Sequence, residues 1–276
     1  LTSYNDYSNG FVSSFNFRSE VDLAPTMGKT LNPKSGSWLE SVLPHELVHA
    51  THANVIAPLS LANLYQFFSP DYARSFNFFP PVGIHEGLAV YYESTAGINS
   101  NSGRANYPYF TNQLAANMGG QNPWNLAQLV TVSDYTIPLD RHYIGGADFT
   151  KWLHQTYGDS ISKQLIRHHQ YFFFLGYGFS MKAKTGKWPR QLYRNYRSYQ
   201  AIEDSARVAG IGSATDRLHT IIPSPFDGTQ NAAPFWISNT EIVFYSRQYN
   251  SSSGFYRYSA ETGTTQQIAE AFVVED

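Results

Sequence analysis

The chain has 276 residues, with 19 basic and 21 acidic side chains and a formal net charge of −2. This balance argues against a nucleic-acid-binding protein, because such a protein needs a basic surface that displaces counterions from the phosphates. The chain has no cysteine, which excludes disulfide bonds, thiolate zinc sites and cysteine nucleophiles.

Aromatic residues make up 16% of the chain, so we expect a soluble globular protein without long disordered segments. The most apolar run, from Tyr171 to Phe179, is too short to span a bilayer, and no transmembrane helix is predicted. The chain begins at Leu1 without a signal segment, so either a leader has been removed or the sequence is an excerpt of a longer one. Sparse charge and many Tyr, Asn and Ser residues are typical of exported bacterial proteins, which predicts an extracytoplasmic location, periplasmic or secreted.

In chain order, the first 36 residues are predicted to form strands and turns that make a small N-terminal sheet. Apolar and small residues fall on one side of two extended runs: Phe11, Ser13, Phe15 and Phe17 in the first, and Val21 and Leu23 in the second.

Helical sequence follows this part of the chain. A helix is expected from about Ser37, and Pro44 within it marks either the start of a new helix or a kink, because proline lacks the N–H donor. The segment from Asn54 to Pro81 is rich in aromatic residues and proline and is not assigned to an element. The remaining expectations are a second helix from Gly83 to Ser94, a polar loop from Gly97 to Tyr107 and further helices to about Val208.

The composition changes after about Ile221. Three short antiparallel strands are predicted, within APFWISNTEIVFYS, FYRYSA and TQQIAEA. Three such strands cannot hold a core alone, so they are interpreted as part of a larger β unit. We therefore predict an α+β protein with a mostly helical domain over residues 1–220 and a β segment over residues 221–276.

The motif HELVH, residues 45–49, carries the chemistry. His45 and His49 lie one turn apart on the same face of a helix, so both can present a ring nitrogen to one metal ion. Glu46 lies next to that face, where it can take a proton from a metal-bound water without ligating the ion. The motif predicts one Zn²⁺ per chain, with Glu46 as the general base.

A catalytic zinc site needs a third protein ligand. His52 is about 10 Å along the helix axis from His45, too far to close around a tetrahedral ion, and is expected to support the site or face solvent. Glu86 on the second predicted helix is the better candidate, with His85 as the weaker rival. Glu93, two turns after Glu86, is expected to orient a ligand histidine.

The metzincin class of zinc peptidases does not fit this sequence. Its motif requires glycine at the position of His52 and histidine at the position of Val55. HExxH followed by an EGLAxYxE helix instead resembles the gluzincin metallopeptidases, in which the Glu of the second helix is the third zinc ligand.

The closer resemblance is to bacterial peptidases of the peptidase MA-like group that are fused to a TolB-like β-propeller. This resemblance implies a zincin-type metallopeptidase domain, a C-terminal segment that corresponds to one propeller blade, and a surface on the propeller for a protein partner. The segments that carry it are Pro81 to Ser94, Gly103–Arg104, Tyr143 to Asp159, Thr185 to Tyr196 and Pro234 to Ala269.

Members of this group usually have more sheet before the HExxH helix, including an edge strand that holds extended substrate. Only 44 residues precede His45, and only one blade is represented, so we expect a fragment of a longer protein. The aromatic segment from Tyr65 to Phe79 is interpreted as core packing for the two metal helices, with a substrate cleft as the alternative.

The resemblance also implies that Tyr143 stabilises the oxyanion of the reaction. From the residues alone, Arg141 and His142 remain alternatives, since any of these donors near the metal can hydrogen-bond a developing negative charge. The helix with Phe149, Trp152 and Leu153 is expected to anchor this segment in the core. The Gly145–Gly146 pair is expected to bend the backbone so that the Tyr143 ring turns towards the metal.

These observations predict zinc-dependent hydrolysis of peptide bonds in a peptide or protein substrate. Two alternatives stay open: a non-catalytic binding protein with structural zinc, and a zinc hydrolase of a non-peptide amide such as a cell-wall crosslink. Retention of Glu46 speaks against the first alternative, because a structural zinc site has no use for a base.

Overall fold

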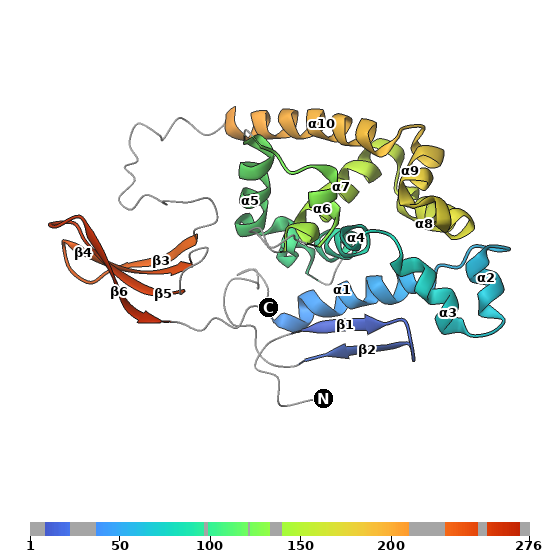
Figure 1. Ribbon diagram of the computed structural model, residues 1–276, viewed down its shortest axis with the longest axis horizontal. Helices are drawn as coiled ribbons and strands as arrows, with labels where there is room; N and C mark the ends of the chain where they lie inside the picture. Colours follow the sequence, from blue (N-terminus) through green and yellow to red (C-terminus); the bar gives the residue numbers. More distant parts are fainter. Residues whose placement is uncertain are drawn as a thin grey trace. The chain divides into compact units, whose positions relative to one another are not determined.

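The computed structural model describes residues 9–22, 37–96, 99–120, 122–132, 140–209, 230–247 and 253–270 (Figure 1). The chain divides into two compact units. The helical unit comprises Leu1–Tyr135 and Leu139–Gly210, and the sheet unit comprises Thr136–Pro138 and Ile211–Asp276. The protein is thus of the α+β class, as predicted. Within the described ranges, no helix is long and apolar enough to cross a membrane.

The helical unit begins with a two-stranded antiparallel hairpin, β1 (Gly10–Ser13) and β2 (Arg18–Val21). The prediction that one extended run continues to Phe17 is wrong, because the chain turns after Ser13. Asn16 has a positive φ of 57°, a conformation that asparagine tolerates better than most residues. Leu23 and the rest of the predicted second run lie outside the described residues.

Helix α1 (Trp38–Ala53) starts directly after Ser37, as predicted, and carries the HELVH motif. Pro44 lies inside this one helix and does not begin a new one. The segment without a predicted element forms two short helices and a 3-10 turn. These are α2 (Leu61–Gln66), α3 (Pro70–Ser75) and η1 (Phe76–Phe78), with serine side chains capping the N-termini of α2 and α3.

Helix α4 (Val82–Thr95) packs between α1 and α7 (Arg141–Tyr157). Glycine makes this close packing feasible: a Cβ atom on Gly87 would lie 2.2 Å from the carbonyl carbon of Gly146. A Cβ atom on Gly146 would lie 2.0 Å from the Gly83 carbonyl oxygen. Gly145 and Gly146 therefore serve helix contact inside a continuous helix, and the prediction that they bend the backbone is wrong.

The remaining helices build the core of this unit around α7. Phe149, Trp152 and Leu153 are buried there, which confirms the predicted anchor, and Tyr196 of the last helix packs edge-on against Phe149. The helical elements concerned are η2 (Ser100–Ser102), η3 (Arg104–Asn106), α5 (Pro108–Gly119), α6 (Leu126–Val130), α8 (Ile161–Phe172), η4 (Phe173–Leu175), α9 (Tyr177–Thr185) and α10 (Pro189–Ala209).

The sheet unit is an antiparallel sheet with the strands in chain order, β3 (Gln230–Trp236), β4 (Glu241–Arg247), β5 (Gly254–Ser259) and β6 (Thr264–Glu270). The prediction of three strands is wrong, because the first predicted strand is a hairpin with its turn at residues 237–240. Ile242, Phe244 and Ser246 alternate on the buried face of β4. Among the described residues, β3 and β6 each pair along one edge only.

Candidate metal centre

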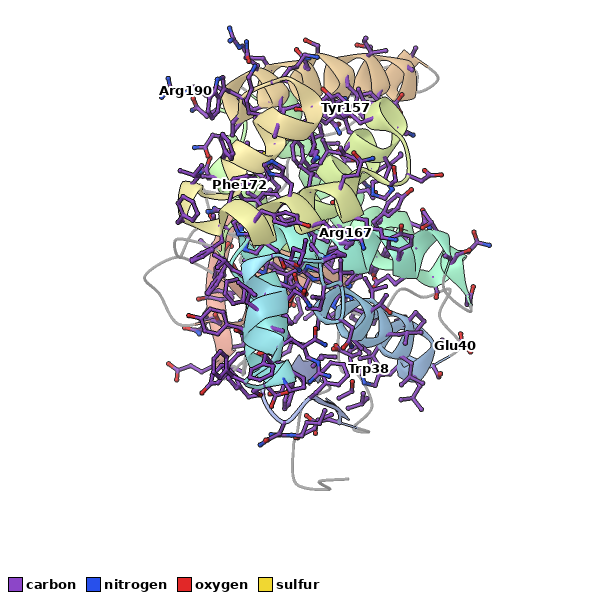
Figure 2. All side chains as sticks on the ribbon, turned by 90° about the vertical axis from the view of Figure 1, so that its right-hand side faces the viewer. Trp38, Glu40, Tyr157, Arg167, Phe172 and Arg190 are labelled. Carbon is purple, nitrogen blue, oxygen red and sulfur yellow. The ribbon has the colours of Figure 1, made fainter. Side chains whose placement is uncertain are left out.

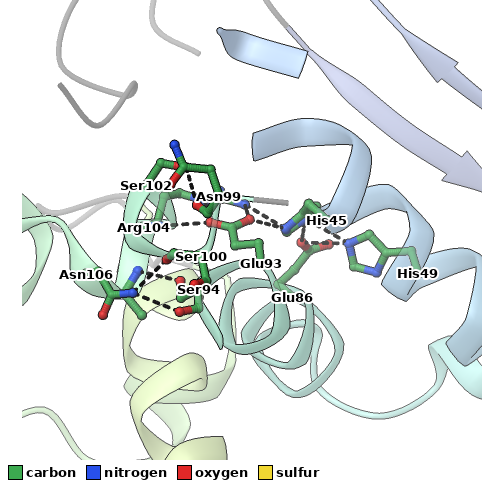
Figure 3. Close-up of polar contacts among 11 residues, drawn as sticks. His45, His49, Glu86, Glu93, Ser94, Asn99, Ser100, Ser102, Arg104 and Asn106 are labelled. Atoms are coloured by element: carbon green, nitrogen blue, oxygen red, sulfur yellow. Dashed lines mark hydrogen bonds and ion pairs between the residues drawn. The ribbon is translucent and has the colours of Figure 1, made fainter. Parts of the chain in front are cut away.

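Two helices bring together the three predicted ligands, His45 and His49 from α1 and Glu86 from α4 (Figure 3). His45 Nε2 lies 3.0 Å from His49 Nε2. Glu86 Oε2 lies 3.2 Å from the first of these nitrogen atoms and 3.1 Å from the second. The three atoms therefore form a nearly equilateral triangle, and both histidines are buried.

This triangle fits the donor set and size of a zinc site. With zinc–ligand bonds of about 2.0–2.1 Å in tetrahedral geometry, neighbouring ligand atoms lie about 3.3 Å apart. Two imidazole nitrogens and one carboxylate oxygen are also a ligand set of catalytic zinc sites, which keep the fourth position for water or substrate. The described residues can thus hold one metal ion here.

Glu93 supports the triangle from behind. His45 Nδ1 lies 2.9 Å from Glu93 Oε2, the orienting contact expected from the spacing of α4. Arg104 binds the same carboxylate: its backbone N–H and its Nε each donate to Oε1 at 2.9 Å, and its Nη2 donates to Oε2 at 3.0 Å. The Glu93 side chain is 1% exposed, so these contacts stand in place of water.

The contacts of Glu93 and Arg104 with His45 bear on which ring nitrogen of His45 carries a proton. His45 Nδ1 lies 2.9 Å from Glu93 Oε2, which only accepts hydrogen bonds, and 2.7 Å from Arg104 Nη2, which only donates. A proton on Nδ1 serves the Glu93 contact, and the His45 Nε2 atom faces a second carboxylate, Glu86. If His45 Nε2 carried no proton and no metal ion, this nitrogen and Glu86 Oε2, 3.2 Å away, would both be hydrogen-bond acceptors. Burial and the Arg104 charge lower the pKa of His45, but the hydrogen bonds with Glu86 and Glu93 outweigh them and raise it.

The two carboxylates of α4 are both held in the ionised form. Burial opposes this, but hydrogen bonds from His45 and His49 lower the pKa of Glu86 far below its ordinary value. Burial alone would raise the pKa of Glu93, but the Arg104 charge and the hydrogen bond with His45 lower it to about 2.

Glu46 is buried on the helix α1 beside the ligands. Its Oε2 has no hydrogen-bond partner among the described residues. Burial, together with the nearby charges of Glu86 and Glu93, raises its pKa to about 7 although His45 lowers it. Strand β1 passes directly over it: a Cβ atom on Gly10 would lie 2.9 Å from Glu46 Oε1.

Tyr143 lies at this site, at the N-terminal end of α7. Its ring centre is 6.3 Å from that of His45, and the Arg104 guanidinium lies 4.8 Å from the centre of the Tyr143 ring. Burial and the Glu86 charge raise its pKa to about 12, so the phenol keeps its proton. The His142 ring is tilted by 38° against that of Tyr143, with ring centres 4.4 Å apart, whereas Arg141 donates from Nε to the Gln128 carbonyl on α6.

Two further histidines pack beside the ligand triangle. The His85 ring lies 5.9 Å from His49, and its Nδ1 is 3.5 Å from Glu86 Oε1. The His52 ring is buried, with its centre 6.1 Å from that of His85, so of the two expectations for His52 the one that it faces solvent is wrong. Burial lowers the pKa of His52 to about 3, which keeps this ring neutral.

No known protein family, no curated protein and no solved structure matches this chain. A functional conclusion therefore depends on the geometry of the site and on the chemistry of its residues.

Sequence reasoning did not assign a role to Arg104. The family resemblance includes Gly103–Arg104. The spacing of residues along the chain, however, does not predict that Arg104 contacts Glu93 on the preceding helix. The structure shows the reason for the Gly–Arg pair, since a Cβ atom on Gly103 would lie 2.3 Å from Ser94 Oγ. The loop thus lies directly on α4 and places Arg104 against Glu93 (Figure 3).

Proposed function

We propose that this protein is a zinc-dependent hydrolase of peptide bonds, of the gluzincin type. One observation carries the proposal: two histidines of HELVH and Glu86 of a second helix place three ligand atoms 3.0–3.2 Å apart. Glu46, which follows a ligand in the chain, lies buried at this triangle with an unpartnered oxygen.

Bound zinc would polarise the substrate carbonyl and lower the pKa of a bound water. His45, His49 and Glu86 would hold the ion, and Glu93 would keep the His45 ring in the orientation and tautomer that ligation needs. Glu46 would accept the proton of the attacking water at its free carboxylate oxygen and pass it to the leaving amine. Tyr143 would donate from its phenol to the oxygen that gains negative charge.

A peptide is favoured as the substrate for two reasons. The HELVH and EGLAVYYE helices resemble those of gluzincin peptidases. Strand β1 also lies over Glu46, and among the described residues it pairs with β2 only. Its second edge would let an extended peptide add as a strand through main-chain hydrogen bonds. We also propose that β3–β6 correspond to one blade of a TolB-like propeller.

Glu46→Gln tests the mechanism. Glutamine keeps the shape of the side chain but cannot accept the proton, so turnover should fall about 10²- to 10⁴-fold while zinc binding persists. The measurements are metal content by mass spectrometry and cleavage of a general peptide library, with and without a chelator. Glu86→Ala is the complementary variant and should lose most of the zinc.

Each alternative predicts a different result. A wild-type protein that binds zinc but cleaves neither peptides nor crosslinked cell-wall fragments would be a binding protein with structural zinc. Cleavage of the cell-wall fragments alone would indicate a non-peptide amide as the substrate. Wild-type activity in Glu46→Gln would refute the assigned base.

A further inference from the structure

The helical unit carries an exposed row of aromatic rings, which we call the aromatic ridge. Phe67 and Phe68, directly after α2, are 89% and 76% exposed, and Phe174 in η4 is 67% exposed. This contradicts the interpretation of Tyr65 to Phe79 as core packing, although Phe76 is buried. The ridge consists of the exposed Tyr65, Phe67, Phe68, Phe79 and Phe174 and of the half-buried Phe173.

The ridge is continuous across elements that are distant in the sequence. Phe67 contacts Phe68 with ring centres 5.7 Å apart, and Phe68 is 6.4 Å from Tyr65. The buried Phe76 joins Tyr65 to the other end of the ridge, where Phe79 stacks on Phe173 at 5.7 Å. Phe174 follows at 5.9 Å. Exposed apolar surfaces of this extent mark sites of interaction with proteins or membranes.

The charge around the ridge selects between these partners. From residue 160 to residue 202 the chain has eight Lys and Arg residues and no Asp or Glu, although its net charge is −2. This segment contains α8, η4 and α9, and η4 contributes two rings to the ridge. Between Glu46 and Glu86, the segment that contributes the other rings, Asp71 is the only acidic residue, and it is paired with Arg74.

Cations follow one face of helix α8, the helix that leads into η4. Lys163, Arg167 and Tyr171 are exposed at steps of four residues, so they follow one another along the helix towards η4. Arg167 and Phe172, and Arg190 at the start of α10, are labelled in Figure 2, which faces this end of the unit. In the described part of the chain, no carboxylate lies within ion-pair distance of Lys163, Arg167 or Lys184.

We propose that the aromatic ridge is a membrane-docking surface for a bilayer with anionic headgroups. The rings enter the boundary between headgroups and acyl chains, and the cations along α8 contact the lipid phosphates. A surface that combines exposed Phe side chains with unpaired cations, and whose segment 47–85 has its one acidic residue, Asp71, paired with Arg74, complements a bilayer with anionic headgroups. The docking does not depend on the metal centre.

Vesicle binding tests this proposal. We expect the protein to cosediment with phosphatidylcholine vesicles that contain 30% phosphatidylglycerol, roughly tenfold more weakly with pure phosphatidylcholine, and less as salt rises. The Phe67→Ser/Phe68→Ser double variant and the Lys163→Glu/Arg167→Glu double variant should each bind the anionic vesicles at least about tenfold more weakly. Matched controls in the sheet unit, Phe235→Ser and Arg257→Glu, should bind like the wild type.

Insertion can be observed directly because the chain has no cysteine. An environment-sensitive fluorophore on Phe67→Cys should shift its emission to the blue and lose quenching by aqueous iodide when anionic vesicles are added. The same label on the exposed control position Phe235→Cys should not change. All variants alter exposed residues, and circular dichroism shows whether each one is folded.

Three results would overturn the proposal. The wild type could fail to bind anionic vesicles at low salt, or the ring variant could bind as tightly as the wild type. The third is a dimer that dissociates in the ring variant while neither protein binds lipid, which would make a second copy of this chain the occupant of the ridge.

Discussion

At the scale of single residues, the Glu93 carboxylate is the most heavily engaged group of the metal centre. It accepts three hydrogen bonds from Arg104, and its Oε2 lies 2.9 Å from His45 Nδ1; the side chain is almost fully buried. Because Glu93 and Arg104 both contact His45 Nδ1, the orientation of this ring and the geometry of the ligand triangle depend on Arg104 although Arg104 is not a ligand.

Arg104→Lys should therefore weaken metal binding without unfolding the protein. Lysine keeps the positive charge but cannot bind both carboxylate oxygens in the fork geometry of a guanidinium. We expect a 10- to 100-fold loss of zinc affinity, the magnitude typical of groups that orient metal ligands. Competition with a zinc-chelating dye measures this loss, and the visible spectrum of the Co²⁺-substituted protein reports the altered ligand geometry.

A suitable control is Arg194→Lys, an exchange at an exposed position of α10. It should leave both zinc affinity and the Co²⁺ spectrum unchanged. Wild-type affinity in Arg104→Lys would show that Glu93 keeps its position without the guanidinium.

At the scale of elements, the crossing of α4 and α7 decides which side chains meet. Gly83 and Gly87 on α4 face Gly146 on α7, and the two backbones touch where any other residue would place a Cβ atom. This contact sets Glu86, on α4, opposite Tyr143, on α7. Helix α1 then adds the histidines from the other side of α4.

Gly87→Ala should destabilise the helical unit by about 1–3 kcal/mol, because a methyl group in a closely packed helix contact forces the helices apart. Its Cβ atom would lie 2.2 Å from backbone that has no rotamer to change. The midpoint of urea unfolding measures this effect. Gly119→Ala on α5 is the matched control, since no atom lies within 4 Å of the added carbon, and it should be neutral or slightly stabilising. Equal midpoints for the two variants would contradict the role of this contact.

At the scale of the whole molecule, the ligand triangle lies entirely in the helical unit, on helices α1 and α4. Zinc should therefore stabilise one unit only, by about 2.7 kcal/mol when free zinc is 100 times its dissociation constant. Calorimetry should show a helical transition that moves to higher temperature with zinc and a sheet transition that does not.

The Glu86→Ala variant provides the control, because its helical transition should respond to zinc much less. If both transitions moved together with zinc, the two units would unfold as one cooperative body.

Much of the centre was predictable from sequence because its geometry is local to helices. His45 and His49 meet because they are four residues apart on one helix, and Glu93 lies two turns from Glu86 for the same reason. The start of α1, the position of α4 and the need for a small residue at Gly87 also follow from spacing and residue type. Turns were harder: the turns after Ser13 and after Trp236 divided runs whose alternation looked continuous.

Only the tertiary structure decided the features that depend on contacts between distant segments. Arg104 reaches Glu93 because its loop lies on α4, and Gly145–Gly146 serves a helix contact and not a bend. Phe67 and Phe76 have the same hydrophobic side chain, yet Phe67 is exposed and Phe76 is buried. Whether a residue is buried depends on which elements pack against it, and the chemistry of that residue does not specify those elements. The spacing of residues along a helix, by contrast, specifies which side chains share one face of the helix.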